Sequence, residues 1–274
     1  MGRADLKVNR TGEADAGPPF KDLLVAEGLT KTFGGLAAVK DVSFTVRRGA
    51  IKAIIGPNGA GKTTLYDLLT GIYAPDSGSA FFEGRSILGL PPHAVSAMGI
   101  ARTFQTVRIF PQMTVQENVM VGLHQRTRSG LLGCSLRLPG AKREEAWIVE
   151  EAWRRLALVG LEMQADSIAG SLPYGQQRVL ELARALATEP KLLLLDEPAS
   201  GLNAYETREL GELIYRVRDM GITVILVEHD MGLVMRISDE VLVLDYGEVI
   251  AEGTPEEVRN DPRVIEAYLG TELD

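Results

Sequence analysis

The sequence has almost nothing with which to stabilise a fold by covalent bonds or bound metal. Its 274 residues include one cysteine, Cys134, and three histidines. A single cysteine excludes an internal disulfide and a zinc site built from several cysteines, and it is typical of a reducing compartment. The fold must therefore rest on a hydrophobic core, and a hydrophobic content of 45% is ordinary for one globular chain.

Long apolar runs and a basic excess are also missing. No stretch approaches the roughly 18 apolar residues that a membrane-spanning helix needs. The first 20 residues lack the apolar segment of a secretory signal, and we interpret 1–20 as a flexible leader. The 29 Lys and Arg against 37 Asp and Glu give a formal net charge of −8, which argues against a nucleic-acid partner. We expect a cytoplasmic chain that reaches a membrane only through partner proteins.

Strand and helix patterns alternate along the rest of the chain. Apolar runs between turn residues predict strands at 23–27, 42–46, 51–55, 79–82, 192–195 and 222–227, and a closing hairpin of 241–244 with 249–251. Helical patterns, which also dominate 91–158 as a whole, are predicted at 62–69, 115–123, 143–158, from 176 onward, and at 205–220. Residues 126–139 have the composition of an exposed insertion. This alternation predicts an α/β fold with a largely parallel central sheet.

Residues 56–63 form a glycine-rich segment that matches the phosphate-binding pattern G-x-x-x-x-G-K-[ST] without a gap. It follows an apolar strand and precedes a helix, so that backbone N–H groups and the helix N-terminus can surround a phosphate. Lys62 would add a cation for the β- and γ-phosphates, and Thr63 a hydroxyl for Mg²⁺. The predicted nucleotide-binding residues are Gly56, Pro57, Asn58, Gly59, Ala60, Gly61, Lys62, Thr63 and Thr64.

The apolar run 192–195 ends in two carboxylates, Asp196 and Glu197. Asp196 is the expected partner of a metal ion and its water shell. Glu197 is expected to orient or deprotonate a water molecule that attacks the γ-phosphate. Taken alone, the pair could be a buried strand reaching its solvated end; together with the glycine-rich loop, it favours ATP hydrolysis.

Further motifs, in a fixed order, make the chain resemble the ATP-binding cassette (ABC) family from about residue 23 to residue 269. Gln105 resembles the family's Q-loop glutamine, and His229 resembles the switch histidine that senses the γ-phosphate. Phe33 stands where the family places an aromatic ring that stacks on adenine. Residues 172–176, Leu-Pro-Tyr-Gly-Gln, resemble the signature Leu-Ser-Gly-Gly-Gln, and residues 200–203 resemble the D-loop. Singly, each has an ordinary structural explanation; the ordered set favours the family.

The resemblance implies a fold class, a P-loop cassette with a mixed, RecA-like core sheet, an antiparallel β subdomain and a helical subdomain that carries the signature. It implies one ATPase domain over 21–274, with a core lobe at about 21–100 and 188–252, a helical lobe at about 106–187 and C-terminal helices at about 255–270. It also implies roles for individual residues: catalysis by Lys62, Gln105, Glu197 and His229; metal binding by Thr63, Gln105 and Asp196; and contact with the ATP of a second subunit by Tyr174, Gly175 and Gln176.

Two motifs depart from the family pattern. The signature has Pro173 in place of serine and Tyr174 in place of glycine, so the serine hydroxyl contact with the γ-phosphate is in doubt. Gly175 and the helix start behind it remain, and their backbone N–H groups can still hold phosphate. In the D-loop, Asn203 replaces the usual aspartate and keeps hydrogen bonding without the charge.

The segment 101–118 resembles a narrower group, the ATPases that power bacterial uptake of branched-chain amino acids. Four other features agree with that group: the insertion at 126–139, the signature variant, residues 197–203 and the tail 253–258. The resemblance implies ATP and Mg²⁺ as cofactors, and a location on the cytoplasmic face of the inner membrane. It implies a second ABC ATPase subunit, identical or sister, two transmembrane permease subunits and, indirectly, a periplasmic binding protein. A urea or amide importer, a lipopolysaccharide exporter and a non-transport ABC protein are the alternatives. A P-loop kinase or GTPase would leave Gln105, the signature and His229 unexplained.

Overall fold

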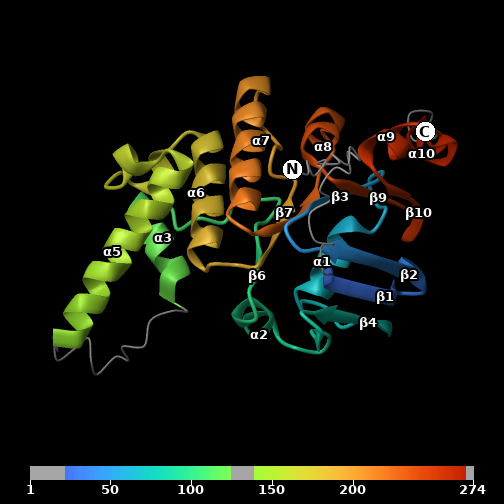
Figure 1. Cartoon of the computed structure of the whole chain (residues 1–274), viewed down its shortest axis with the longest axis horizontal. Coiled ribbons are helices and arrows are strands. Elements are labelled where there is room, and N and C mark those ends of the chain that lie inside the picture. Colours follow the sequence, from blue (N-terminus) through green and yellow to red (C-terminus); the bar gives the residue numbers. More distant parts are fainter. Residues whose placement is uncertain (1–21, 125–138, 270–274) are drawn as a thin grey trace, which may run out of the picture.

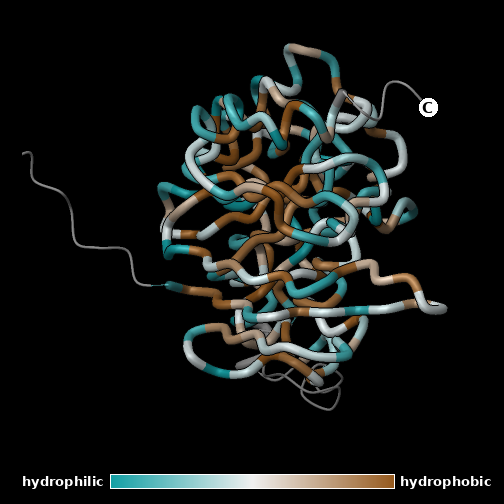
Figure 2. The backbone as a smooth tube through the Cα atoms, turned by 90° about the vertical axis from the view of Figure 1, so that its right-hand side faces the viewer, coloured by the Kyte–Doolittle hydropathy of each residue, from teal (hydrophilic) through white to brown (hydrophobic). Residues whose placement is uncertain are grey.

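The computed structural model describes residues 22–124 and 139–269 of the chain (Figure 1). The leader predicted for 1–20 and nearly all of the insertion predicted at 126–139 lie outside these residues. Two sheets and a group of helices make up the described part. The hydrophobic segments gather in its interior (Figure 2).

The central sheet has six strands in the order β10-β9-β3-β8-β7-β6. They are β10 (Glu248–Gly253), β9 (Glu240–Asp245), β3 (Ile51–Ile55), β8 (Thr223–Val227), β7 (Leu192–Asp196) and β6 (Ile100–Arg102). Neighbours from β9 to β6 are parallel, and β10 is antiparallel to β9. Every residue of β3, β7 and β8 is buried, as expected for parallel strands covered on both faces.

Successive residues of the central strands enter different cores. In β7, Leu192 and Leu194 pack in a cluster with the second sheet and α1 (Lys62–Leu69), whereas Leu193 and Leu195 pack in a cluster with α6, α7 and α8. The period-two geometry of a strand produces this division. The helices concerned are α6 (Tyr174–Ala187), α7 (Ala204–Asp219) and α8 (Met231–Ile237).

The second sheet is antiparallel and has the order β2-β1-β4-β5. Its strands are β2 (Leu36–Arg47), β1 (Asp22–Phe33), β4 (Ser77–Phe82) and β5 (Arg85–Ser86). β1 and β2 are longer than the predicted 23–27 and 42–46. Their pairing contains register shifts, with Gly28 at φ +60° and Asp41 at φ +52°, and these irregular, polar stretches have no clear alternation in the sequence.

A separate helical part lies to one side of the sheets, at the left of Figure 1. It consists of α3 (Val115–Leu123), α5 (Pro139–Val159) and α6, which share a cluster that includes Leu123, Leu156 and Leu180. A capping box between Thr114 and Glu117 fixes the start of α3. The helices predicted at 115–123 and 143–158 are confirmed, and α5 begins earlier than predicted.

Short elements account for the errors of the secondary-structure prediction. The mainly helical stretch expected from 91 to 158 contains β6, whose three residues are a strand only because β7 pairs with them. It also contains the short helix α2 (Pro92–Ala97), and α8 was not predicted. The C-terminal helices are α9 (Pro255–Arg259) and α10 (Pro262–Leu269). Within 22–124 and 139–269, no helix is long and apolar enough to cross a membrane. The predicted fold class is confirmed.

Candidate functional site

The loop between β3 and α1 can form only because two of its glycines lack side chains. A Cβ on Gly56 would lie 2.0 Å from the carbonyl oxygen of Leu244, and a Cβ on Gly61 would lie 2.2 Å from the carbonyl oxygen of Ala38. Both glycines also have positive φ, +150° and +99°. The loop therefore packs closely against the end of β9 and the start of β2, and Asn58 and Gly59 form its exposed tip.

Lys62, the first residue of α1, folds back into this loop. Its Nζ donates to the carbonyl oxygens of Gly56 at 2.7 Å and Pro57 at 2.9 Å, and the residue is only 6% exposed. Burial lowers the pKa of the Lys62 ammonium, and the charges of Glu197 and Asp196 act in the opposite direction. The loop therefore holds a cation at its centre, as phosphate binding requires.

Asp196 is the last residue of β7, and its side chain is 3% exposed. Its Oδ2 accepts a hydrogen bond from Nη2 of Arg102 at 2.8 Å. Its Oδ1 is buried and has no hydrogen-bond partner among the described residues. Burial raises the pKa of the Asp196 carboxyl, and Arg102 opposes this shift. A buried oxygen without a partner is costly, and it is the kind of atom that a cation would satisfy.

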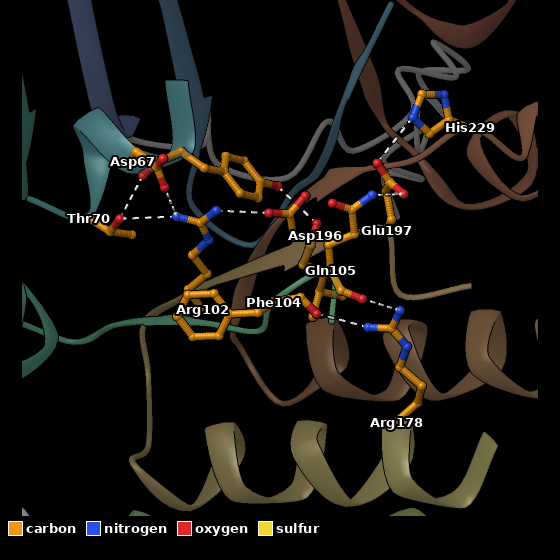
Figure 3. Close-up of polar contacts among 11 residues, drawn as sticks. Asp67, Thr70, Arg102, Phe104, Gln105, Arg178, Asp196, Glu197 and His229 are labelled. Carbon is orange, nitrogen blue, oxygen red and sulfur yellow. Dashed lines mark hydrogen bonds and ion pairs between the residues drawn. The ribbon is translucent and has the colours of Figure 1, made fainter. Parts of the chain in front are cut away.

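The neighbouring carboxylate, Glu197, joins two other predicted site residues (Figure 3). Its Oε2 accepts from Nε2 of Gln105 at 2.9 Å, and its Oε1 lies 3.2 Å from Nε2 of His229. The backbone of Glu197 is left-handed, with φ +46°, and its N–H donates to the carbonyl oxygen of Val227 at 2.9 Å. Such a conformation is strained for a residue with a side chain, and it aims this carboxylate between Gln105 and His229.

The three residues predicted to bind metal share one cavity. Thr63, Gln105 and Asp196 line a space of about 430 Å³ together with Asp67 and Arg102. A hydroxyl, an amide oxygen and a carboxylate are the oxygen ligands that Mg²⁺ prefers. The donor set and the unpartnered Oδ1 of Asp196 therefore fit Mg²⁺.

Two arginines in this region were not predicted as site residues. Arg102, at the end of β6, bridges Asp67 at 2.5 Å and Asp196 at 2.8 Å, and its side chain is 6% exposed. Arg178, from α6, donates to the carbonyl oxygens of Phe104, at 2.8 Å, and Gln105. Arg102 lies in the segment 101–118 singled out from the sequence, but only the pairing of β6 with β7 places it beside Asp196.

The remaining predicted residues lie apart from this polar network. Phe33, at the end of β1, is 43% exposed, and its ring meets that of Tyr73 edge to face with centroids 5.2 Å apart. Tyr174, Gly175 and Gln176 form the first turn of α6. Gly175 and Gln176 line a different groove, next to α7.

Two protein-family models match the sequence of this chain. The family model described as ABC transporter matches residues 39–200. The family model described as branched-chain amino acid ATP-binding cassette transporter matches residues 248–274. The chain therefore belongs to the ABC transporter family and is one of its ATPase cassettes. The family resemblance identified from the sequence motifs is confirmed.

Individual relatives are similar over nearly their whole length. The chain is 48% identical over 249 residues to the high-affinity branched-chain amino acid transport ATP-binding protein LivG of Salmonella typhimurium, an alignment that covers 90% of this chain and 98% of LivG. It is 46% identical over 251 residues to BraF of Pseudomonas aeruginosa, with 91% and 98% covered. The ADP conformation of MJ1267, an ATP-binding cassette of an ABC transporter, is 33% identical with a TM-score of 0.79, covering 91% of this chain and 99% of that one.

Proposed function

We propose that this chain hydrolyses ATP to power an importer of branched-chain amino acids. The observation that carries the proposal is the position of the Glu197 carboxylate, held between Gln105 and His229 beside the glycine-rich loop. A carboxylate fixed in this way can orient a water molecule and accept its proton. The substrate class comes from relatives such as LivG and BraF, whose names specify branched-chain amino acid transport.

The residues around the loop have separate tasks in this proposal. The Lys62 ammonium and the backbone N–H groups of 56–61, apart from Pro57, which has none, bind the phosphates, and Phe33 stacks on adenine. Thr63, Gln105 and Asp196 would hold Mg²⁺, which supplies positive charge to the phosphate oxygens. His229 steadies Glu197 at 3.2 Å.

The site is completed by a second ATPase subunit, identical or sister. The first turn of α6 carries Tyr174, Gly175 and Gln176, with Pro173 at its N-cap and no acidic residue. Its backbone N–H groups would face the phosphates of ATP bound to the other subunit. A head-to-tail pair with two-fold or pseudo-two-fold symmetry then forms two such sites. MJ0796, a bacterial ABC transporter cassette with 25% identity and a TM-score of 0.72, has a dimeric structure.

A groove beside the Q-loop suits a permease subunit. It has a volume of about 300 Å³ and is lined by residues of four elements, among them Val95 of α2, Ala101 of β6, Val121 of α3 and Arg184 of α6. Phe104, the neighbour of Gln105, also lines it. A cytoplasmic segment of a permease in this groove would contact the backbone that positions Gln105, and it would hold the chain at the inner face of the membrane.

Glu197→Gln tests the assignment of the base. The variant keeps the size of the side chain but cannot take a proton, so we expect ATP binding to persist while hydrolysis falls by about 10²- to 10⁴-fold. Glu256→Gln, on the exposed surface of α9, is the matched control. Unchanged hydrolysis in Glu197→Gln would refute the assignment.

The transport assay is uptake of leucine, isoleucine and valine by vesicles that contain the chain with a second ATPase subunit, two permease subunits and a binding protein. Uptake that requires ATP and intact Glu197 supports the proposal. Uptake of urea or an amide in place of these amino acids would contradict the substrate class while leaving the ATPase assignment intact.

A further inference from the structure

Glu228, the residue before His229, is a buried carboxylate to which the proposed reaction gives no role. It follows the last residue of β8 and is 3% exposed. Three backbone N–H groups donate to it: that of Ala199 to Oε1 at 2.6 Å, and those of His229 and Asp230 to Oε2 at 2.9 and 3.3 Å. Burial raises the pKa of the Glu228 carboxyl, and the three N–H groups oppose this shift.

These donors belong to two different segments, one after β7 and one after β8. Ala199 lies two residues beyond Glu197, and His229 opens the loop that follows β8. The same segments meet twice more, where the N–H of Glu197 donates to the carbonyl oxygen of Val227 and where Nε2 of His229 approaches the Glu197 carboxylate. Glu228 thus closes a ring of contacts around the 3.2 Å approach between the proposed base and its histidine.

We infer that Glu228 is a positioning residue for hydrolysis, which clamps the segment after Glu197 to the loop that carries His229. The inference rests on the proposed function, because it assigns Glu228 a task toward the same two residues. Without the clamp, the bond from the Glu197 N–H to the carbonyl oxygen of Val227 is the remaining backbone contact between the two described segments, and Ala199 is no longer tied to the loop that carries His229. The imidazole then loses its fixed place against Glu197.

The chemistry of the three donors requires a carboxylate at position 228. A carboxylate is acceptor-only and has two oxygens, whereas a glutamine side chain has one oxygen and one N–H₂ group. In Glu228→Gln, the oxygen satisfies the most donors when it faces His229 and Asp230, and the N–H₂ group then faces the N–H of Ala199. The substitution is nearly isosteric, yet it removes selectively the hydrogen bond that the N–H of Ala199 donates to residue 228.

The test compares Glu228→Gln with the wild type in the full-length chain, assembled with its permeases where the chain alone does not hydrolyse ATP. We expect kcat to fall by about 10- to 100-fold, since a displacement near 1 Å in a reacting group can cost about 100-fold. The affinity for a fluorescent ATP analogue should stay within about twofold, since Glu228 does not line the loop 56–61. Glu151→Gln, in a carboxylate of α5 that is 7% exposed, controls for the loss of a buried charge and should match the wild type.

A second measurement separates the clamp from the proposed reaction. The chain has three histidines, so their ring ¹⁵N signals can be assigned by substitution. The signal of His229 should shift in Glu228→Gln and not in Glu151→Gln, while those of His93 and His124 stay in place. This readout needs no ATPase activity, so it tests the clamp even if the proposed function fails.

Two results would overturn the inference. A kcat within twofold of the wild type together with an unmoved His229 signal means that Glu228 positions nothing. A parallel loss of nucleotide affinity, or shifts in all three histidine signals, means that Glu228 only supports the fold. A shifted His229 signal in a chain with no ATPase activity would support the clamp and count against the proposed function.

Discussion

Replacing Arg102 should reverse the sign of the effect that a second substitution, at Asp67, has on the free energy of unfolding. The Arg102 guanidinium lies between the carboxylates of Asp67 and Asp196, at 2.5 and 2.8 Å. The side chains of the three residues are 6%, 16% and 3% exposed, so water screens these charges little. Whether a substitution here lowers or raises the free energy of unfolding therefore depends on which buried charge it leaves without a partner.

The magnitudes come from the cost of a buried charge without a partner. Arg102→Met removes the cation and leaves two carboxylates, which should cost about 3–5 kcal/mol of the free energy of unfolding. Asp67→Asn in the wild type removes one charge-assisted hydrogen bond but keeps an amide oxygen as acceptor, at a cost of about 1–2 kcal/mol. In the Arg102→Met background, the same change removes the carboxylate that repels Asp196, so it should be neutral or stabilising.

The assay is urea-induced unfolding of the four proteins of this double-mutant cycle, followed by circular dichroism at pH 7. EDTA is present and nucleotide is absent, so that no divalent cation neutralises Asp196. Arg154→Met is the matched control, because Arg154 pairs with Glu150 and Glu151 but its side chain is 59% exposed. We expect that control to cost less than about 1 kcal/mol.

The reasoning fails if Asp67→Asn has the same effect in both backgrounds. Equal effects would mean that the free energies of the two sites are additive, as for residues that do not interact. A cost for Arg102→Met that is no larger than that for Arg154→Met would also contradict the buried ion pair.

Two further outcomes follow from contacts within the loop 56–63 and at the start of the helical part. Gly61→Ala should cost about 3 kcal/mol or more of the free energy of unfolding, because the added Cβ meets the carbonyl oxygen of Ala38. Gly59→Ala, with φ +81° and no atom within 4 Å of the added Cβ, should cost about 1–2 kcal/mol from the left-handed backbone alone. Equal shifts of the two variants in thermal unfolding would contradict this reasoning. Asn118→Ala should cost about 2–4 kcal/mol of the free energy of unfolding, because the buried Asn118 side chain hydrogen-bonds both the N–H and the carbonyl oxygen of Phe110. The variant should also exchange the amide hydrogen of Phe110 faster than the wild type. Unaltered exchange at Phe110 would count against this prediction.

Much of the fold could be predicted because the central strands have a strong local signal. The runs 51–55 and 192–195 are apolar throughout, and burial on both faces requires this of parallel strands. The three residues of β6 carry no such signal, since their hydrogen bonds come from β7, about 90 residues later in the chain. The polar, irregular ends of β1 and β2 are strands through pairing with each other.

The candidate site divides in the same way. The loop 56–63 and the pair Asp196-Glu197 are local motifs, each with its chemistry in consecutive residues. The ion pair of Arg102 with Asp196 joins residues 94 positions apart, and the clamp of Glu228 on Ala199 joins residues 29 apart. These contacts depend on which strands are neighbours, and the sequence does not specify that order locally.

Tyr174, in the segment that resembles the family signature, contacts two other parts of the chain. The ring of Tyr174 lies against Gly201, where an added Cβ would be 2.9 Å from its Cε1, and the guanidinium of Arg178 lies 5.4 Å from the centre of the same ring. Arg178 also holds the carbonyl oxygens of Phe104 and Gln105. A backbone shift at Gln105 must therefore move Arg178 or break the hydrogen bond between the two residues. Since Arg178 and Tyr174 share one face of α6, a continuous chain of contacts joins the backbone of Gln105 to the first turn of this helix within one chain.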